Sequence, residues 1–99
     1  MREVNKEELI KEINENEKVL VDFFATWCPP CKALGPIVEE FASEHEEIRV
    51  LKVNVDENQE LAIEYGVTLV PTLIFIENGE VKKRNSGIMD KNELENFAK

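Results

Sequence analysis

The stretch Thr26-Trp27-Cys28-Pro29-Pro30-Cys31 contains both cysteines of this 99-residue chain, with only two prolines between them. A disulfide between such close neighbours closes almost no loop, so it stabilises a fold very little. Two cysteines are also too few for the disulfide framework of a small secreted domain. Reactivity therefore explains the pair better than a structural role does.

The two prolines predict the backbone around the cysteines. Pro29 disfavours the α region for Cys28, so Cys28 is expected to cap or precede a helix whose first turn contains Pro29, Pro30 and Cys31. Both sulfurs then lie on one side, at a separation that a disulfide can span. The partial positive charge of a helix N-terminus favours the thiolate of Cys28. We predict a reversible dithiol/disulfide couple.

Strand-like segments flank this motif on both sides. Val19–Phe24 and Ile48–Val55 are short and rich in β-branched or aromatic residues, which is typical of strands in the centre of a sheet. Further along the chain, Asn78-Gly79 separates two more such runs, Thr72–Ile76 and Val81–Arg84. An Asn-Gly pair between strand-like runs predicts a β-hairpin.

Helix signals fill the gaps between the strands. Three segments begin with a variant of the capping box, at Asn5…Glu8, Asp56…Gln59 and Asp90…Glu93. A fourth helix follows Cys31, with apolar residues at the 3.6-residue period and an internal proline, Pro36, that predicts a kink. With a brief opening strand, this order predicts one α/β domain over residues 1–99, a three-layer sandwich with parallel strands and an antiparallel hairpin edge.

Composition and charge argue against several partners. Hydrophobic residues make up 42% of the chain and charged residues 33%, and the net charge is −9. Nucleic acids and anionic membranes both require clustered lysine and arginine, so neither is expected as a partner. No apolar run approaches the about 20 residues of a membrane helix, and the first residues do not resemble a signal peptide. We therefore expect a cytoplasmic protein. We also expect a monomer.

Asp22 stands out because it interrupts the apolar segment Val19–Phe24 just before the cysteines. A buried carboxylate without a full partner has a raised pKa and suits a proton shuttle to and from Cys31. The alternative is a structural ion pair with Lys52. For the cysteines the alternative is a metal site, but zinc takes four ligands and the chain has one histidine, His45. A zinc site shared between two chains stays open.

The segment from Val21 to Lys32 closely resembles the active site of the thioredoxin family. The resemblance extends over nearly the whole chain, through Pro36, Lys52-Val53-Asn54-Val55-Asp56, Tyr65-Gly66-Val67, Val70-Pro71-Thr72, the run from Phe75 to Val81, and Gly87. It implies the thioredoxin fold, with a mixed sheet of about five strands and four helices. It also implies a thiol-disulfide oxidoreductase that reduces disulfides in protein substrates.

The resemblance assigns roles to individual residues. Cys28 would be the exposed nucleophile and Cys31 the buried resolving thiol. Asp22 would be the buried carboxylate beneath them, with Lys52 as its supporting neighbour. Substrates would bind at Trp27, Pro29, Pro30, Val70, the cis residue Pro71, and Gly87. The chain lacks a glycine-rich phosphate loop, so no bound cofactor or metal is expected, and an external NADPH-dependent flavoprotein reductase would supply electrons.

Several residues depart from the family pattern. Pro29 replaces the usual glycine between the cysteines, and neither intervening residue is the histidine of strongly oxidising relatives. Leu69 replaces a common Gly or Ser, and Ser86 a common Val. These changes put the choice of partner in doubt. Two other interpretations also stay open: an extracytoplasmic thiol oxidant or isomerase, and a binding module that uses the thioredoxin surface without redox chemistry.

Overall fold

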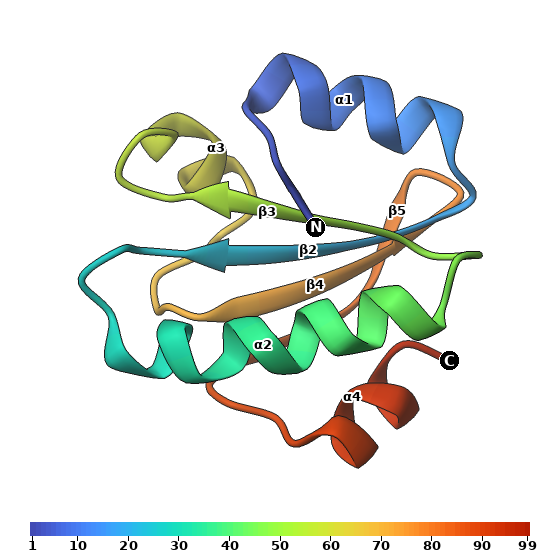
Figure 1. Cartoon of the computed structure of the whole chain (residues 1–99). Helices are drawn as coiled ribbons and strands as arrows, with labels where there is room; N and C mark the ends of the chain where they lie inside the picture. The colour runs from blue at the N-terminus through green and yellow to red at the C-terminus, as the bar shows by residue number, and fades with distance from the viewer.

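The computed structural model describes residues 1–99 and arranges them in three layers (Figure 1). The five-stranded sheet has the order β1-β3-β2-β4-β5. Strands β1, β3 and β2 are parallel, β4 runs antiparallel to β2, and β5 antiparallel to β4. The strands are β1 (Arg2–Glu3), β2 (Lys18–Phe24), β3 (Arg49–Asn54), β4 (Thr72–Glu77) and β5 (Glu80–Ser86). The predicted fold class and element order are confirmed.

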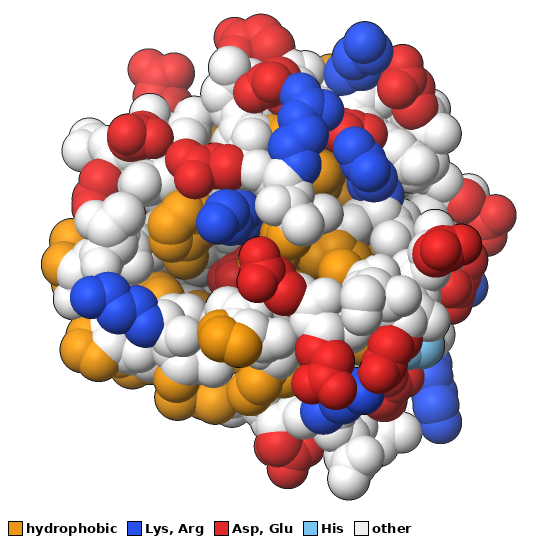
Figure 2. Space-filling model, viewed as in Figure 1, with side chains coloured by type: hydrophobic (Ala, Val, Ile, Leu, Met, Phe, Trp, Pro, Cys, Tyr) orange, Lys and Arg blue, Asp and Glu red, His pale blue; other side chains and the backbone are white.

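Two helices cover each face of the sheet. They are α1 (Lys6–Glu15) and α3 (Gln59–Glu64) on one face, and α2 (Pro29–Glu44) and α4 (Lys91–Phe97) on the other (Figure 1). The longest helix, α2, has 16 residues, and none of the four has both the length and the apolar content to cross a bilayer. Figure 2 shows charged side chains over α1 and the far end of α2, and hydrophobic ones gathered near the start of α2.

The central strand β2 separates two hydrophobic cores because its side chains alternate between the faces of the sheet. Val19, Val21 and Phe23 are fully buried on the side of α1 and α3. Leu20 belongs to the core under α2 and α4. Asp22 follows on this second face, where an apolar residue would continue the pattern. The strand therefore carries one carboxylate into the interior beneath the start of α2.

Two of the three predicted capping boxes are confirmed. Asn5 accepts a hydrogen bond from the N–H of Glu8 (2.9 Å), and Asp90 accepts one from that of Glu93 (2.8 Å); both glutamates return the bond to the cap backbone. The third was wrong, because α3 begins at Gln59 after Asn58, and no side chain caps it.

The displaced start of α3 has a local cause. The side-chain oxygen of Asn54 accepts hydrogen bonds from the N–H groups of Asp56 (2.9 Å) and Glu57 (3.3 Å). This turn at the end of β3 uses the residues that would have opened the helix. The Asp56 carboxylate instead accepts a hydrogen bond from the indole Nε1 of Trp27, at 2.8 Å.

The predicted hairpin between β4 and β5 is also confirmed. Asn78 (φ +52°) and Gly79 (φ +80°) both lie in the left-handed region, as the two central residues of a type I′ turn require. That turn matches the right-handed twist of the flanking strands, so the short connection sets their register. Both strands extend beyond the ranges predicted from composition.

Candidate active site

The two cysteines lie where β2 ends and α2 begins, and they form a disulfide with a Cα–Cα distance of 5.2 Å. Cys28 is the N-cap residue of α2, with extended backbone angles (φ −96°, ψ 108°), and Pro29 and Pro30 follow in the first turn. The N–H of Cys31 points at the Cys28 Sγ, 3.2 Å away. The predicted local geometry is therefore confirmed, and a backbone donor faces the sulfur that would carry negative charge.

The expectation that Cys28 is exposed was wrong for the disulfide form. Cys28 is 3% exposed and Cys31 6%. Cys28 is covered because the loop before β4 packs against it, with the carbonyl oxygen of Val70 3.6 Å from the Cys28 Sγ. Phe24, Val55 and Val70 complete the apolar surroundings of the pair.

The loop before β4 has the backbone shape that the family resemblance implied. The Val70–Pro71 peptide bond is cis, and Pro71 is buried. The N–H of Gly87, a residue with φ +104°, donates to the carbonyl of Pro71 at 2.9 Å. The structure thus brings Val70, Pro71 and Gly87 together beside the disulfide.

Several exposed side chains of the motif and of the loops next to β4 and β5 are uncharged. Trp27 is 66% exposed, Leu69 65% and Ile88 51%, and Pro29 and Pro30 are also exposed. These five residues, together with Val70, are called the docking face below. Exposed apolar residues are candidates for a surface that contacts other proteins.

Asp22 is buried without a hydrogen-bond partner for its Oδ1 atom, and only 3% of the residue is exposed. Lys52 is its register partner on β3, but no nitrogen of Lys52 lies within 4.0 Å of the carboxylate, and Lys52 Nζ lies 5.3 Å from the centre of the Phe24 ring. Burial raises the pKa of Asp22 to about 7, and the charge of Lys52 opposes the rise. Asp22 and Lys52 therefore do not form the structural ion pair that was the alternative interpretation.

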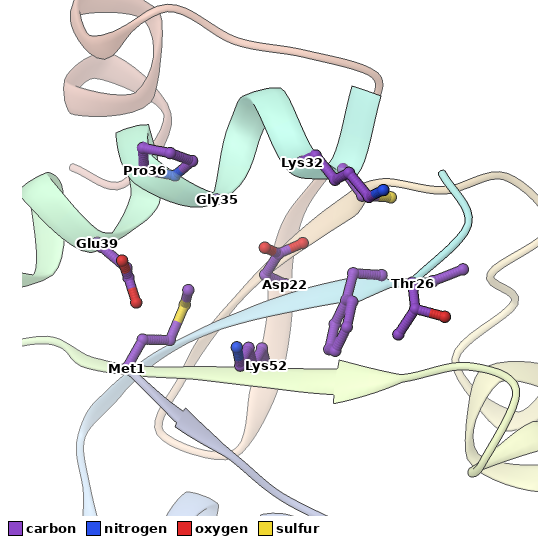
Figure 3. Close-up of a pocket in the computed structure, with 11 residues that line it drawn as sticks. Met1, Asp22, Thr26, Lys32, Gly35, Pro36, Glu39 and Lys52 are labelled. Atoms are coloured by element: carbon purple, nitrogen blue, oxygen red, sulfur yellow. The ribbon is translucent and has the colours of Figure 1, made fainter. Parts of the chain in front are cut away.

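A pocket of about 410 Å³ connects this carboxylate with solvent. Figure 3 shows Asp22 pointing from β2 toward α2, with Lys52 on β3 and with Glu39 of α2 and Met1 close to each other farther along the pocket. Cys31 also lines the pocket. Asp22 and Cys31 thus line one pocket that opens to solvent.

His45 lies at the other end of α2 from the cysteines and shares no site with them. Its ring stacks on Phe41 (centroids 4.2 Å apart), and its two nitrogens face Glu47 (3.3 Å) and Glu95 (2.8 Å). Glu44, His45 and Glu95 have ligand atoms within 4.8 Å of one another. Within this group, Glu44 already has a cationic partner, since the ammonium of Lys91 lies 2.6 Å from it. A zinc site formed by the cysteines and His45 of one chain is excluded.

Known proteins share both this sequence and this geometry. The sequence profile described as "Thioredoxin" matches residues 1–99. The chain belongs to the thioredoxin family. A thioredoxin from Mycoplasmoides gallisepticum is 43% identical over 96% of this chain and 95% of its own length. A mitochondrial thioredoxin of Mus musculus is 46% identical over 88% of this chain and 53% of its own length.

Solved structures agree with the sequence comparison. The X-ray structure of Fasciola hepatica thioredoxin superposes with a TM-score of 0.91 at 42% identity, covering 98% of this chain and 96% of that one. Family, fold and a disulfide-forming cysteine pair together establish thiol-disulfide oxidoreductase activity. Membership of the thioredoxin family also implies disulfide substrates and a reductase as classes of partner.

Reasoning from the sequence missed several contacts around the site. It assigned no role at the site to Asp56, which holds Trp27, or to Thr72, whose hydroxyl donates to the Leu69 carbonyl at 2.6 Å. It noted Ser86 only as a departure from the family. The Trp27–Asp56 and Thr72–Ser86 contacts join residues 29 and 14 positions apart, so local patterns gave no signal for them.

Proposed function

We propose that this protein is a thioredoxin that reduces disulfides of other proteins through its Trp-Cys-Pro-Pro-Cys motif, with residues 1–99 as one catalytic domain. The observation that supports this most directly is the arrangement of three groups around one disulfide. Cys28 is the N-cap residue of α2, and Cys31 lies in the first turn of that helix. The unpartnered carboxyl of Asp22 lines the same pocket as Cys31.

The reaction uses two thiol-disulfide exchanges. The Cys28 thiolate attacks one sulfur of the substrate disulfide, forms a mixed disulfide and expels the other substrate sulfur as a thiolate. Cys31 then loses its proton to the Asp22 carboxylate and attacks the Cys28 sulfur. This second exchange releases the remaining substrate thiolate and forms the Cys28–Cys31 disulfide, so two electrons have moved to the substrate. A group that titrates near pH 7 suits this proton transfer.

Docking would place the substrate disulfide over Cys28. An extended substrate segment can hydrogen-bond to the backbone of Val70 and Gly87 as an added strand. Its side chains would rest on Trp27, Pro29 and Pro30, which are exposed beside the motif. Pro71 would shape this loop, and the positive charge of Lys52 would limit the rise in the pKa of Asp22.

An external NADPH-dependent flavoprotein, a thioredoxin reductase, would return the pair to the dithiol. The domain would itself hold no cofactor, because the electrons reside on its two sulfurs. We place the protein as a monomer in a reducing compartment such as the cytoplasm, where a reductase can keep the pair reduced.

Cysteine substitution tests the assignment of the two thiols. We expect Cys28→Ser to abolish reduction of insulin disulfides, because no nucleophile remains. Cys31→Ser should instead accumulate a mixed disulfide with the substrate, which mass spectrometry of the quenched reaction detects. In the reduced wild type, alkylation near neutral pH should modify Cys28 first. Faster labelling of Cys31, or a trapped adduct in Cys28→Ser, would reverse the roles.

The reduction potential separates this function from that of a thiol oxidant. No histidine lies between the cysteines, so we expect a potential within tens of millivolts of the about −270 mV of thioredoxin. Equilibration with glutathione buffers, followed by alkylation and mass analysis, measures it. A potential near the about −120 mV of a strong oxidant would favour the oxidant. Biological activity that survives loss of both cysteines would favour the binding module.

A further inference from the structure

Ser86 lies at the end of β5 opposite Thr72 of β4. Their hydroxyl oxygens are 2.9 Å apart. The Thr72 Oγ1 also lies 2.6 Å from the carbonyl oxygen of Leu69, three residues earlier in the chain. A chain of three polar groups therefore runs from the end of β5 to the loop that carries Leu69 and Val70.

The direction of these hydrogen bonds follows from the chemistry of the groups. A hydroxyl has one hydrogen to donate and a carbonyl only accepts. Thr72 must therefore use its hydrogen on the Leu69 carbonyl, which leaves Ser86 as the donor to the Thr72 Oγ1. A hydroxyl that accepts a hydrogen bond becomes a better donor, so the Ser86 contact strengthens the bond from Thr72 to Leu69.

The loop held in this way contacts the reactive disulfide. The next carbonyl, that of Val70, lies 3.6 Å from the Cys28 Sγ, and the side chain of Leu69 is 65% exposed on the docking face. Thr72 itself is 1% exposed, so its hydroxyl has no solvent to replace a lost partner. Fixing the Leu69 carbonyl thus fixes the backbone that would receive a substrate strand.

We propose that Ser86 is a positioning residue for protein substrates: its hydroxyl, acting through Thr72, holds the Leu69–Val70 backbone in the geometry that docking requires. The inference rests on the proposed docking of proteins at this loop. The hydrogen bonds from Ser86 to Thr72 and from Thr72 to the Leu69 carbonyl are called the relay below. A preorganised loop loses less conformational entropy when it binds, so the relay lowers the KM for protein disulfides. Small disulfides, which contact the sulfur without the loop, gain nothing from it.

Two isosteric substitutions test the role of the hydroxyl. Ser86→Val and Ser86→Thr add side chains of nearly equal shape to β5, but only threonine keeps the hydroxyl. We expect Ser86→Val to raise the KM for insulin disulfides roughly threefold to tenfold, the effect of losing about one hydrogen bond. Its kcat, and its rate with a small neutral disulfide, should stay within about twofold of the wild type. Ser86→Thr should restore the wild-type KM.

A double-mutant cycle tests whether Ser86 acts through Thr72. If it does, Ser86→Val should add no further rise in KM once Thr72→Val has broken the relay. Additive effects would overturn the proposal, as would an unchanged KM in Ser86→Val or a Ser86→Thr variant as impaired as Ser86→Val. Thr72 is buried, so should Thr72→Val fail to fold, the comparison of the two Ser86 variants decides alone.

Leu69→Glu separates this inference from the docking function on which it rests. A charge on the docking face should slow reduction of protein disulfides even when the relay is intact. Slow reduction by Leu69→Glu with normal kinetics in Ser86→Val would reject the relay and keep the docking site. Normal kinetics in Leu69→Glu with a raised KM in Ser86→Val would reject Leu69 as a contact and keep the relay.

Discussion

Asp22 shows how one residue can be costly for the fold and useful for the reaction. Its neighbours on β2 are buried apolar side chains, and its Oδ1 has no partner. Burial therefore raises its pKa from 3.8 to about 7. The proton is retained at a pH where an exposed aspartate has lost it. Between these two values the folded protein binds more protons than the unfolded chain, so stability falls as the pH rises.

We expect Asp22→Asn to remove this pH dependence. Relative to the wild type, the variant should gain roughly 2–3 kcal/mol in free energy of unfolding between about pH 5 and about pH 8.5, since each unit up to about 7 contributes about 1.4 kcal/mol. Urea unfolding of the disulfide form at both pH values measures the gain. Parallel pH profiles for the two proteins would mean that Asp22 titrates as an ordinary carboxylate. The same variant should prolong the mixed disulfide, because Cys31 loses its proton acceptor.

At the scale of elements, Glu12 links the first helix to two strands. This residue of α1 is 7% exposed, and its carboxylate accepts hydrogen bonds from Arg2 of β1 (2.9 Å) and Arg49 of β3 (2.9 Å). Asn16 adds a third donor at 3.2 Å. The hydrogen bond from Arg49 is the main cause that holds the pKa of Glu12 below its ordinary value of 4.5.

Glu12→Gln should therefore destabilise the protein near neutral pH. We expect a loss of about 1–2 kcal/mol, because charged hydrogen bonds disappear while both arginines, which are about half exposed, regain water. A lowered folded-state pKa contributes stability above the ordinary value and loses it as the pH falls. The difference between variant and wild type should accordingly shrink below about pH 4 in urea titrations. A constant difference across that range would assign the loss to packing.

The elements also show what could be predicted from the sequence. Alternating strands and helices, the hairpin and the caps at Asn5 and Asp90 were predictable, because each depends on residues a few positions apart. The start of α3 was not, because Asn54 turns the chain there and the Asp56 side chain that was expected to cap the helix instead bonds Trp27, 29 residues earlier in the chain. The burial of Cys28 depends in the same way on Val70, 42 residues later. Contacts between distant segments thus complete the site, although the motif at its centre is local.

At the scale of the whole molecule, the charged side chains lie outside the docking face. The chain carries a net charge of −9, yet the docking face consists of uncharged side chains. An anionic ligand is therefore repelled by the molecule as a whole rather than by the surface it contacts. Such repulsion reaches about 30 Å at 0.01 M salt and only about 10 Å at 0.1 M.

Reduction of an anionic aromatic disulfide should consequently accelerate with salt. We expect the second-order rate constant to rise roughly two- to fivefold between about 0.01 M and about 0.3 M ionic strength, as screening removes the repulsion. A neutral disulfide of similar size serves as the control and should react at a constant rate. Stopped-flow absorbance follows both reactions. Slowing with salt would show that lysines near the motif, such as Lys32, govern the local field.

The edge strand β5 affects how this protein behaves among copies of itself. It lies at one edge of the sheet and carries Lys82, Lys83 and Arg84 in succession. A free sheet edge invites strands of other molecules and so promotes aggregation, and lysines there oppose it. Two such edges meeting antiparallel would bring like charges together and leave them poorly hydrated. The cationic side chains of β5 thus oppose polymerisation of the protein through its own sheet.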